Sequence, residues 1–193
     1  MDNLPRVSDI LKILFPGNLD FVPQAALDRG TRLHEAMEIW VNNQLHHYTD
    51  PVTLDAGILP VIEWMSKQPL VLESAEEAVF HKFGVRGHPD LLCQWRKFPY
   101  WFDWKFVEQL SEVNLVQGTA YNYLTGRKGV FIQCNKAGEV TIHRCKTNPA
   151  HWSAFVSGLN VWKFHNRKTA AITEAQLQQQ IEEIKEALCQ TER

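Results

Sequence analysis

The chain has 193 residues, 45% hydrophobic and 22% charged, so it is long enough for a compact domain with a sizeable core and is not a disordered chain. Its formal net charge of −2 excludes a uniformly basic coat but leaves room for a local basic channel. No stretch approaches the roughly 20 apolar residues of a membrane span, and the first residues lack the cleavage site of a secretory signal. We therefore expect a cytoplasmic protein that makes no contact with a membrane.

The first seventy residues favour helices. Apolar residues recur at helical spacing over residues 7–14. A second helix begins near Gln24, and Gly30 marks a point where it could break. Residues 58–67 predict a third helix. The second helix has an apolar stripe formed by Leu33, Met37, Trp40, Val41 and Leu45.

The pattern then changes to strands rich in β-branched and aromatic residues, which are separated by Gly84 and by a turn over residues 96–99. We expect these strands to form an antiparallel meander. Its three predicted strands are residues 75–83, 85–95 and 100–107.

A helix over residues 111–125 follows the meander and predicts a crossover to the next strand, as in α/β proteins. That strand, 129–134, forms a hairpin with 140–145. Two C-terminal helices complete the pattern, over 149–165 and 173–189. The order of elements predicts an α/β fold with a mixed central sheet flanked by helices.

The third predicted strand is apolar on both faces except at Asp103 and Lys105. Because side chains alternate along a strand, these two residues share a face. Burying either charge alone costs several kcal/mol. A structural ion pair is one interpretation, since a single Asp-x-Lys triplet occurs by chance in about half of chains of this length.

Asp90 adds a second carboxylate within an apolar run, at the end of the segment Gly87-His88-Pro89-Asp90. If the two strands are hairpin neighbours, Asp90 and Asp103 converge. Converging carboxylates repel each other unless a cation lies between them, and Mg²⁺ prefers oxygen ligands. Lys105 would then polarise the nucleophile or stabilise charge on a phosphorane.

Two helices carry polar pairs with a spacing of four, which places each pair on one helical face. The pairs are His34 with Glu38, and Gln117 with Tyr121. Each pair alone is typical of a solvated surface or of a hydrogen-bonded core.

In chain order, four motifs together resemble the RecB-like exonuclease branch of the PD-(D/E)XK nuclease superfamily. They are a G-x-x-x-H helix ending at His34, a G-x-x-D strand ending at Asp90, a D-x-K strand from Asp103 to Lys105, and a Q-x-x-x-Y helix from Gln117 to Tyr121.

The resemblance implies a restriction-endonuclease-like core within a single nuclease domain over residues 1–193. Its parts would be N-terminal helices (1–70), a core sheet with a crossover helix (71–146) and C-terminal helices (147–193). The implied activity is metal-dependent hydrolysis of DNA phosphodiesters by an exonuclease in a bacterial or phage-infected cell. The implied partner is DNA, as single strands or duplex ends, and a homo-oligomer or a recombination partner protein stays open.

The resemblance also assigns roles to residues. Lys105 would be the catalytic lysine, and Gln117 and Tyr121 would brace the site or touch DNA. The family has a glutamate on its first core strand, for which Glu76 fits slightly better than Glu77. Mg²⁺ or Mn²⁺ would be held by His34, Asp90, Asp103 and the backbone carbonyl of Trp104.

Some relatives carry four cysteines that hold an iron–sulfur cluster. Here the cysteines are scattered, so we expect reduced thiols and no cluster. They are Cys93, Cys134, Cys145 and Cys189.

Two alternatives stay open: an inactive nuclease fold that binds DNA or a protein, and a hydrolase of RNA or nucleotides. Aromatic side chains that would stack on bases, if they are not core residues, are Tyr100, Trp101, Trp152 and Trp162. Basic side chains that would line a phosphate path, if they are not plain surface, are Arg86, Arg96, Lys97, Arg127, Lys128, Arg167 and Lys168.

Overall fold

The computed structural model describes residues 4–17, 22–47 and 55–166. The chain divides into two units, Met1–Trp162 and Lys163–Arg193, and of the second only residues 163–166 are described. The predicted helix over 173–189 therefore lies outside the described residues, as do Arg167, Lys168 and Cys189. The single domain expected over 1–193 stays a prediction.

A five-stranded mixed sheet forms the centre of the first unit, in the order β1-β4-β5-β6-β7. β5 and β6 are parallel, and the other neighbours are antiparallel. The parallel pair is joined by helix α4 (Glu112–Thr125), so the predicted crossover and the α/β fold are confirmed. The strands are β1 (Leu70–Ala75), β4 (Leu91–Trp95), β5 (Phe98–Lys105), β6 (Lys128–Cys134) and β7 (Val140–Cys145).

The predicted three-strand meander is wrong in its first half. The segment 85–95 is divided into β3 (Val85–Gly87) and β4, and Pro89, which has no N–H for a ladder, lies between them. β3 pairs with β2 (Val79–His81) in a separate two-stranded sheet. The strand that joins the central sheet is β1, an edge strand with a register shift between Leu72 and Ser74, which blurs its alternation in the sequence.

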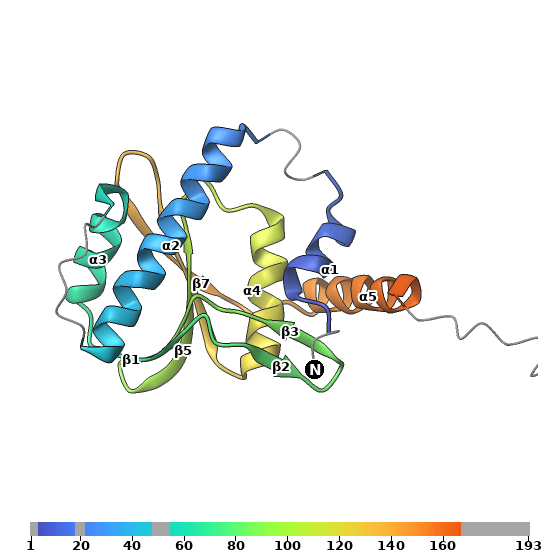
Figure 1. The fold of residues 1–193 in the computed structure, drawn as a ribbon. Coiled ribbons are helices and arrows are strands. Elements are labelled where there is room, and N and C mark those ends of the chain that lie inside the picture. The colour runs from blue at the N-terminus through green and yellow to red at the C-terminus, as the bar shows by residue number, and fades with distance from the viewer. Residues whose placement is uncertain (1–3, 18–21, 48–54, 167–193) are drawn as a thin grey trace, which may run out of the picture. The chain divides into compact units, whose positions relative to one another are not determined.

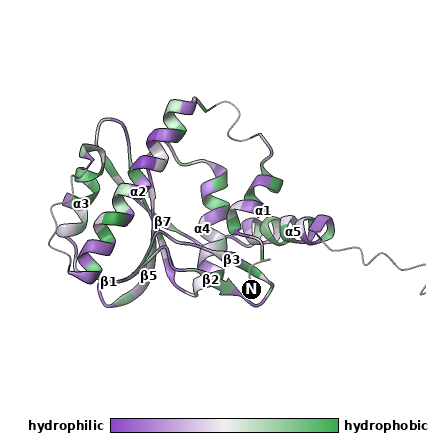
Figure 2. Ribbon diagram, in the orientation of Figure 1, coloured by the Kyte–Doolittle hydropathy of each residue, from purple (hydrophilic) through white to green (hydrophobic). Residues whose placement is uncertain are grey.

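Helices cover both faces of the sheet (Figure 1). Helices α2 (Gln24–His46) and α3 (Leu59–Ser66) pack on one face, in a core that includes Met37, Met65 and Phe102. On the other face α4 lies against β6 and β7, α1 (Val7–Leu14) packs on α4, and α5 (Pro149–Asn166) meets α1 at Gly158. Figure 2 shows hydrophilic and hydrophobic residues interleaved along α2, as expected of a helix with one buried side. None of the described helices is long and apolar enough to cross a membrane.

Helix α2 is not broken at Gly30. A methyl group added there would meet no atom within 4 Å, so Gly30 makes no close approach that requires a glycine. Burial of Leu33, Met37 and Val41 against the sheet holds the helix together. Tertiary packing thus overrides the low helix propensity of glycine, which costs about 1 kcal/mol relative to alanine.

Gly129 is required by the indole ring of Trp101. A Cβ atom at position 129 would lie 1.9 Å from Cζ2 of that ring, which is fixed by a 3.0 Å hydrogen bond from its Nε1 to Oδ1 of Asn122. Gly129→Ala is therefore expected to lower the free energy of unfolding by about 1–3 kcal/mol or more, as overpacking does. Urea denaturation measures this. Gly30→Ala is the matched control and is expected to be neutral or stabilising; equal effects of the two substitutions would contradict this account of Trp101.

Candidate active site

A cluster of acidic side chains lies where β1 and β5 end and β4 begins. Because β4 runs antiparallel to β5, with Leu91 opposite Phe102, the residue before β4 lies beside the end of β5. There the backbone N–H of Trp104 donates a 2.7 Å hydrogen bond to Oδ2 of Asp90. The structure thus brings Asp90 next to the Asp103–Lys105 segment, as the hairpin arrangement required.

Asp103 and Lys105 lie on the face of β5 that α4 covers. Asp103 is 2% exposed, and its Oδ1 forms an ion pair with the Lys105 ammonium group. The Lys105 Nζ also lies 5.4 Å from the centre of the Phe131 ring. Burial alone would lower the pKa of Lys105, but the charges of Asp103 and Asp90 outweigh it and raise that pKa. The lysine therefore carries its charge at neutral pH.

Asp90 is the most strongly perturbed acid of the cluster. Burial is the main reason that its pKa lies well above the usual range, and the neighbouring charge of Asp103 raises it further. Lys105 and the Trp104 N–H act in the opposite direction but do not cancel these effects. The site concentrates more negative charge than its single ammonium group neutralises, which favours binding of a cation.

The structure places Glu76, and not Glu77, beside Asp90. Glu76 follows β1 with a φ of 50°, a left-handed conformation, and its N–H donates to the Asp90 carbonyl at 3.2 Å. Burial raises the pKa of Glu76, as does the nearby charge of Glu38, while a side-chain hydrogen bond with Asp90 lowers it. Glu77 is exposed.

Helix α2 contributes His34 and Glu38 to the same region. The His34 ring lies edge-on to Phe106, with centroids 5.6 Å apart. Burial lowers the pKa of His34; Asp103 raises it and Lys105 lowers it, but burial prevails. His34 is therefore a neutral imidazole near Asp103, which is the form that binds metals.

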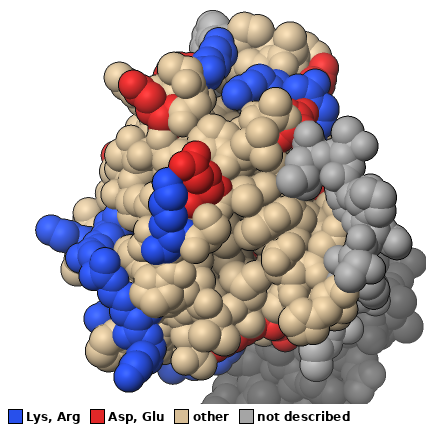
Figure 3. Space-filling model, turned by 90° about the vertical axis from the view of Figure 1, so that its left-hand side faces the viewer, with Lys and Arg blue, Asp and Glu red and all other residues tan. Residues whose placement is uncertain are grey.

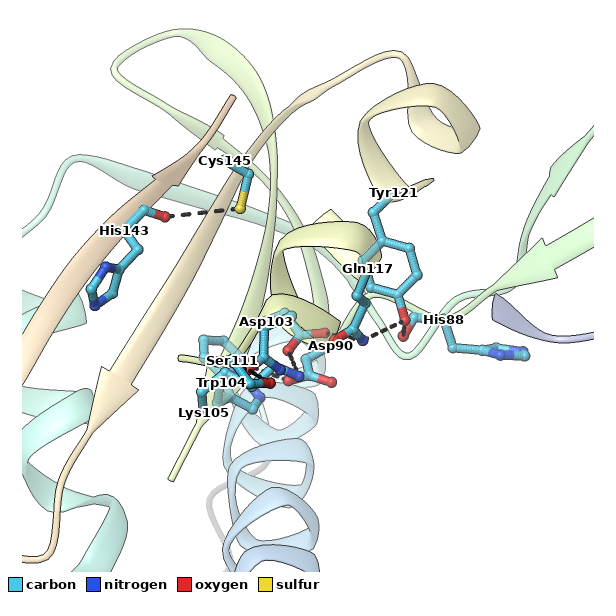
Figure 4. A network of polar contacts seen from close by, with 11 residues as sticks. His88, Asp90, Asp103, Trp104, Lys105, Ser111, Gln117, Tyr121, His143 and Cys145 are labelled. Carbon is cyan, nitrogen blue, oxygen red and sulfur yellow. Dashed lines mark hydrogen bonds and ion pairs between the residues drawn. The ribbon is translucent and has the colours of Figure 1, made fainter. Parts of the chain in front are cut away.

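Helix α4 supplies a chain of hydrogen bonds that ends on Asp103 (Figure 4). Nε2 of Gln117 lies 3.4 Å from Oδ2 of Asp103 and 3.3 Å from the hydroxyl of Tyr121. That hydroxyl donates to the His88 carbonyl at 3.0 Å. Burial, followed by the charge of Asp103, raises the pKa of Tyr121 well above its usual range, so the hydroxyl keeps its proton.

Two glycines allow α4 to come this close. A Cβ atom at Gly118 would lie 2.9 Å from the Phe131 ring, and one at Gly87 would lie 2.8 Å from the Tyr121 ring. The sequence showed the spacing of Gln117 and Tyr121, but the partner of Tyr121 is a backbone carbonyl, which leaves no signal in a sequence.

Gln133 and His143 form a polar pair that we did not predict. Gln133 lies opposite Lys105 in the β5–β6 ladder and is 8% exposed. Its Nε2 donates to the carbonyls of Val107 (3.1 Å) and Glu108 (2.6 Å), and its Oε1 lies 2.7 Å from Nε2 of His143. This pair ties down the segment that follows Lys105. The available signal was a glutamine within an apolar strand.

A cavity of about 400 Å³ adjoins the acidic cluster. Arg6 stands at the start of α1 and was also missed, since nothing in the sequence distinguishes it from surface. Burial lowers the pKa of His88, and the charges of Arg6 and Arg86 lower it further. The polar residues that line the cavity are Arg6, Ser8, Glu76, His88 and Tyr121. The cavity therefore places cationic and hydrogen-bonding groups next to the acidic cluster.

The donor set fits a hard divalent cation, although the ligand trio is not preformed. Among residues 4–17, 22–47 and 55–166, no three His, Cys, Asp or Glu side chains already form a metal-binding group. What supports the fit is chemical: Asp90 and Asp103 are crowded carboxylates, and oxygen donors are those that Mg²⁺ and Mn²⁺ prefer.

The described cysteines are free thiols on three different strands: Cys93 on β4, Cys134 on β6 and Cys145 on β7. Burial raises the pKa of Cys93 and of Cys145 to about 12, so both stay protonated.

Of the two uses considered for Trp101, the structure shows core packing, because this side chain is fully buried and contacts the rings of Tyr121 and Phe131. Trp152 is partly buried and stacks on Tyr123 with ring centres 4.0 Å apart. Packing between α4, α5 and the sheet accounts for both rings.

No family profile matches this chain, and neither does any curated protein. Solved structures do resemble it. LHK-Exo, an alkaline exonuclease from Laribacter hongkongensis, is 11% identical with a TM-score of 0.49, over 96% of this chain and 93% of that chain. LHK-Exo in complex with dAMP is 12% identical with a TM-score of 0.50, over 97% and 94%. SSO0001 is 10% identical with a TM-score of 0.45, over 88% and 79%. At a TM-score of 0.50 the chain shares the fold of LHK-Exo, which agrees with the fold expected from the sequence.

Proposed function

We propose that this protein is a metal-dependent DNA nuclease, and specifically an exonuclease, that hydrolyses phosphodiester bonds. The observation that carries the proposal is the cluster of Asp90, Asp103 and Lys105, a charged lysine beside two crowded carboxylates. It lies at the strand ends of a fold shared with LHK-Exo.

Asp90 and Asp103 would hold Mg²⁺ or Mn²⁺, together with His34 and the backbone carbonyl of Trp104. The bound ion would supply a Lewis acid, which polarises a phosphate oxygen and makes a water molecule more acidic. His34 is suited to bind the metal ion because burial keeps its imidazole neutral. Glu76, which contacts Asp90, would orient that carboxylate or accept a proton from water.

Lys105 would stabilise the negative charge that develops on the phosphate during hydrolysis. Its ammonium group is charged, buried and held by Asp103, so little reorganisation is needed when the substrate binds. Gln117 and Tyr121 would fix the orientation of Asp103 and contact the DNA strand.

DNA is the substrate that we favour. LHK-Exo, which has the same fold, has been solved with dAMP. In this chain the cavity beside Glu76 offers Arg6 and Ser8 as partners for a phosphate group. An inactive binding module, in which Lys105 only neutralises Asp103, is the second candidate; the additional carboxylate of Asp90 beside this pair favours the nuclease.

The test is digestion of end-labelled single-stranded DNA, duplex DNA and RNA with Mg²⁺, with Mn²⁺ and with a chelator. We expect metal-dependent shortening of DNA from its ends, and none by Asp103→Asn. Binding without cleavage under every metal condition would identify an inactive module. Digestion of RNA alone would overturn the choice of DNA.

Tyr121→Phe is expected to lower DNA turnover about two- to tenfold, the effect of losing one hydrogen bond of about 0.5–1.5 kcal/mol. Mn²⁺ affinity should stay nearly unchanged, because the hydroxyl bonds Gln117 and a backbone carbonyl and no expected metal ligand. Steady-state kinetics and calorimetry give the two quantities. Tyr123→Phe, which removes the same group from an exposed ring on α4, is the control. A collapse of Mn²⁺ affinity in Tyr121→Phe would show that this helix belongs to the metal site.

A further inference from the structure

The β4–β5 turn places two cationic residues in an unfavourable backbone conformation. Trp95 pairs with Phe98, so Arg96 and Lys97 are the central residues of a two-residue turn. Both have a positive φ, 53° for Arg96 and 70° for Lys97. Turns of this kind favour Asn-Gly, because most side chains are strained there. Local strain of this kind persists where a function retains it.

Aromatic rings lie beneath the cations around this turn. The guanidinium groups of Arg96 and Arg144 lie 5.3 Å and 5.8 Å from the centre of the Trp95 ring. Nζ of Lys128 lies 5.1 Å from the centre of the Phe98 ring, which is 58% exposed. We refer to these exposed residues as the basic turn surface: Arg96, Lys97, Phe98, Lys128 and Arg144.

No carboxylate neutralises this surface among the residues that the structure describes. All ion pairs among the described residues involve basic side chains outside this surface; Arg127, for example, is paired with Glu73. In Figure 3, Lys and Arg side chains gather along one edge of the face drawn. A protein with a net charge of −2 thus keeps a local positive potential, which attracts anions.

We propose that the basic turn surface binds the phosphodiester backbone of a nucleic acid strand away from the active site. This inference rests on the proposed function. Cations on aromatic rings beside an exposed Phe98 ring combine the two contacts that single strands use, phosphate pairing and base stacking. A membrane or an acidic protein would need the charges but not the ring.

The surface lies at the opposite end of β5 from Asp103. Phe98 and Asp103 are five residues apart on this strand, which corresponds to about 17 Å at 3.3–3.4 Å per residue. A strand stacked at about 3.4 Å per nucleotide spans this distance with about five nucleotides beyond the cleaved bond, and a fully extended strand, with roughly twice that rise, spans it with about three. A trinucleotide reaches the active site but not this surface.

The decisive variant is Arg96→Asn with Lys97→Gly, which installs the favoured turn and removes two charges. We expect its melting temperature to rise by a few degrees, because strain is relieved. We also expect weaker binding of a single-stranded DNA of about 30 nucleotides, measured without metal, and a salt slope smaller by about 1.4, or about 0.7 for each lost phosphate contact. Greater stability combined with weaker binding is a result that a purely structural turn does not produce.

A second pair, Lys128→Gln with Arg144→Gln, tests the same surface without changing the turn and should reduce the salt slope equally. The matched control is Arg32→Gln with Lys67→Gln, which removes two exposed cations elsewhere. The proposal is overturned if both surface variants bind like wild type, or if the control loses as much affinity. It is also overturned if wild type binds vesicles of anionic lipid through these residues and binds no oligonucleotide.

Turnover of a trinucleotide with Mg²⁺ separates this inference from the proposed function. All surface variants should cleave it like wild type, and a loss there would place the surface in the active site and refute the proposal. If wild type binds long DNA with the expected salt slope but cleaves nothing, the proposed nuclease activity fails while the surface assignment stands.

Discussion

Lys105→Ala is expected to lower DNA turnover about a hundredfold or more, the effect of removing one group that stabilises a transition state. The ammonium group is paired with Asp103, lies within the electrostatic reach of Asp90 and is charged at neutral pH, so it is placed to stabilise charge on a phosphate. With Mn²⁺ present, the variant should fold, bind the metal and keep its affinity for DNA, because the metal ion neutralises the negative charge of the carboxylates. Activity, melting temperature and DNA affinity should be measured on one preparation.

A purely structural lysine gives a different pattern. Its removal would break a buried ion pair and cost about 3–5 kcal/mol of stability, while turnover by the remaining folded protein would change little. Lys105→Met keeps an unbranched apolar side chain but removes the ammonium group that lies over the Phe131 ring, and it serves if the alanine variant does not fold. Lys67→Ala, which breaks an exposed pair with Glu63, is the matched control. Near wild-type turnover by folded Lys105→Met would falsify the catalytic assignment.

Asp90→Asn is expected to abolish nuclease activity and yet stabilise the metal-free protein at neutral pH. Burial and Asp103 raise the pKa of Asp90 in the folded protein, so the folded state prefers the protonated acid. The stability provided by protonated Asp90 is fully present below the unfolded pKa of about 3.9 and is lost as the pH rises through the folded pKa. Asparagine cannot ionise and avoids this loss, which is about 1.4 kcal/mol for each pH unit that separates the folded pKa from the unfolded pKa.

Urea denaturation of wild type and Asp90→Asn from below about pH 4 to neutral pH, with a chelator present, measures the difference in their free energies of unfolding. The advantage of Asp90→Asn should be small below about pH 4 and should grow with pH. Mg²⁺ should raise the melting temperature of wild type, by the free energy of binding, but not that of the variant. Asp28→Asn, on the exposed side of α2, removes the same charge as a control. A variant that is less stable than wild type at neutral pH without metal, or that Mg²⁺ stabilises equally, would contradict the crowding of Asp90 and Asp103.

The candidate site was predictable wherever it depends on the period of one element. Alternation along a strand places Asp103 and Lys105 on one face of β5, and the structure joins them in an ion pair. Helical spacing predicts that Gln117 and Tyr121 share a face, and they hydrogen bond. Periodicity is a local property of the backbone, so it can be derived from residues alone.

The extent and pairing of the first strands were not predictable in the same way. Whether residues 70–75 join the central sheet depends on a partner, β4, that lies some twenty residues further along the chain. The sequence could not decide between Glu76 and Glu77. The structure distinguishes them, because Glu76 follows the end of β1 in a left-handed conformation and its N–H donates a hydrogen bond to the Asp90 carbonyl. The sequence contains two adjacent glutamates, and spacing treats them almost alike.

The sequence by itself determined the order of elements, the crossover through α4 and the faces that carry the polar residues, because these follow from local periodicity and turn chemistry. Only the tertiary structure decided which of those faces meet. The chain passes unbroken through Gly30 because burial of Leu33 and Met37 outweighs local propensity. Asp90 becomes a strongly perturbed acid because Asp103, Glu76 and Lys105 arrive from other strands and turns. Burial and the distances between charges are properties of packing, and they set the pKa values on which the proposed chemistry depends.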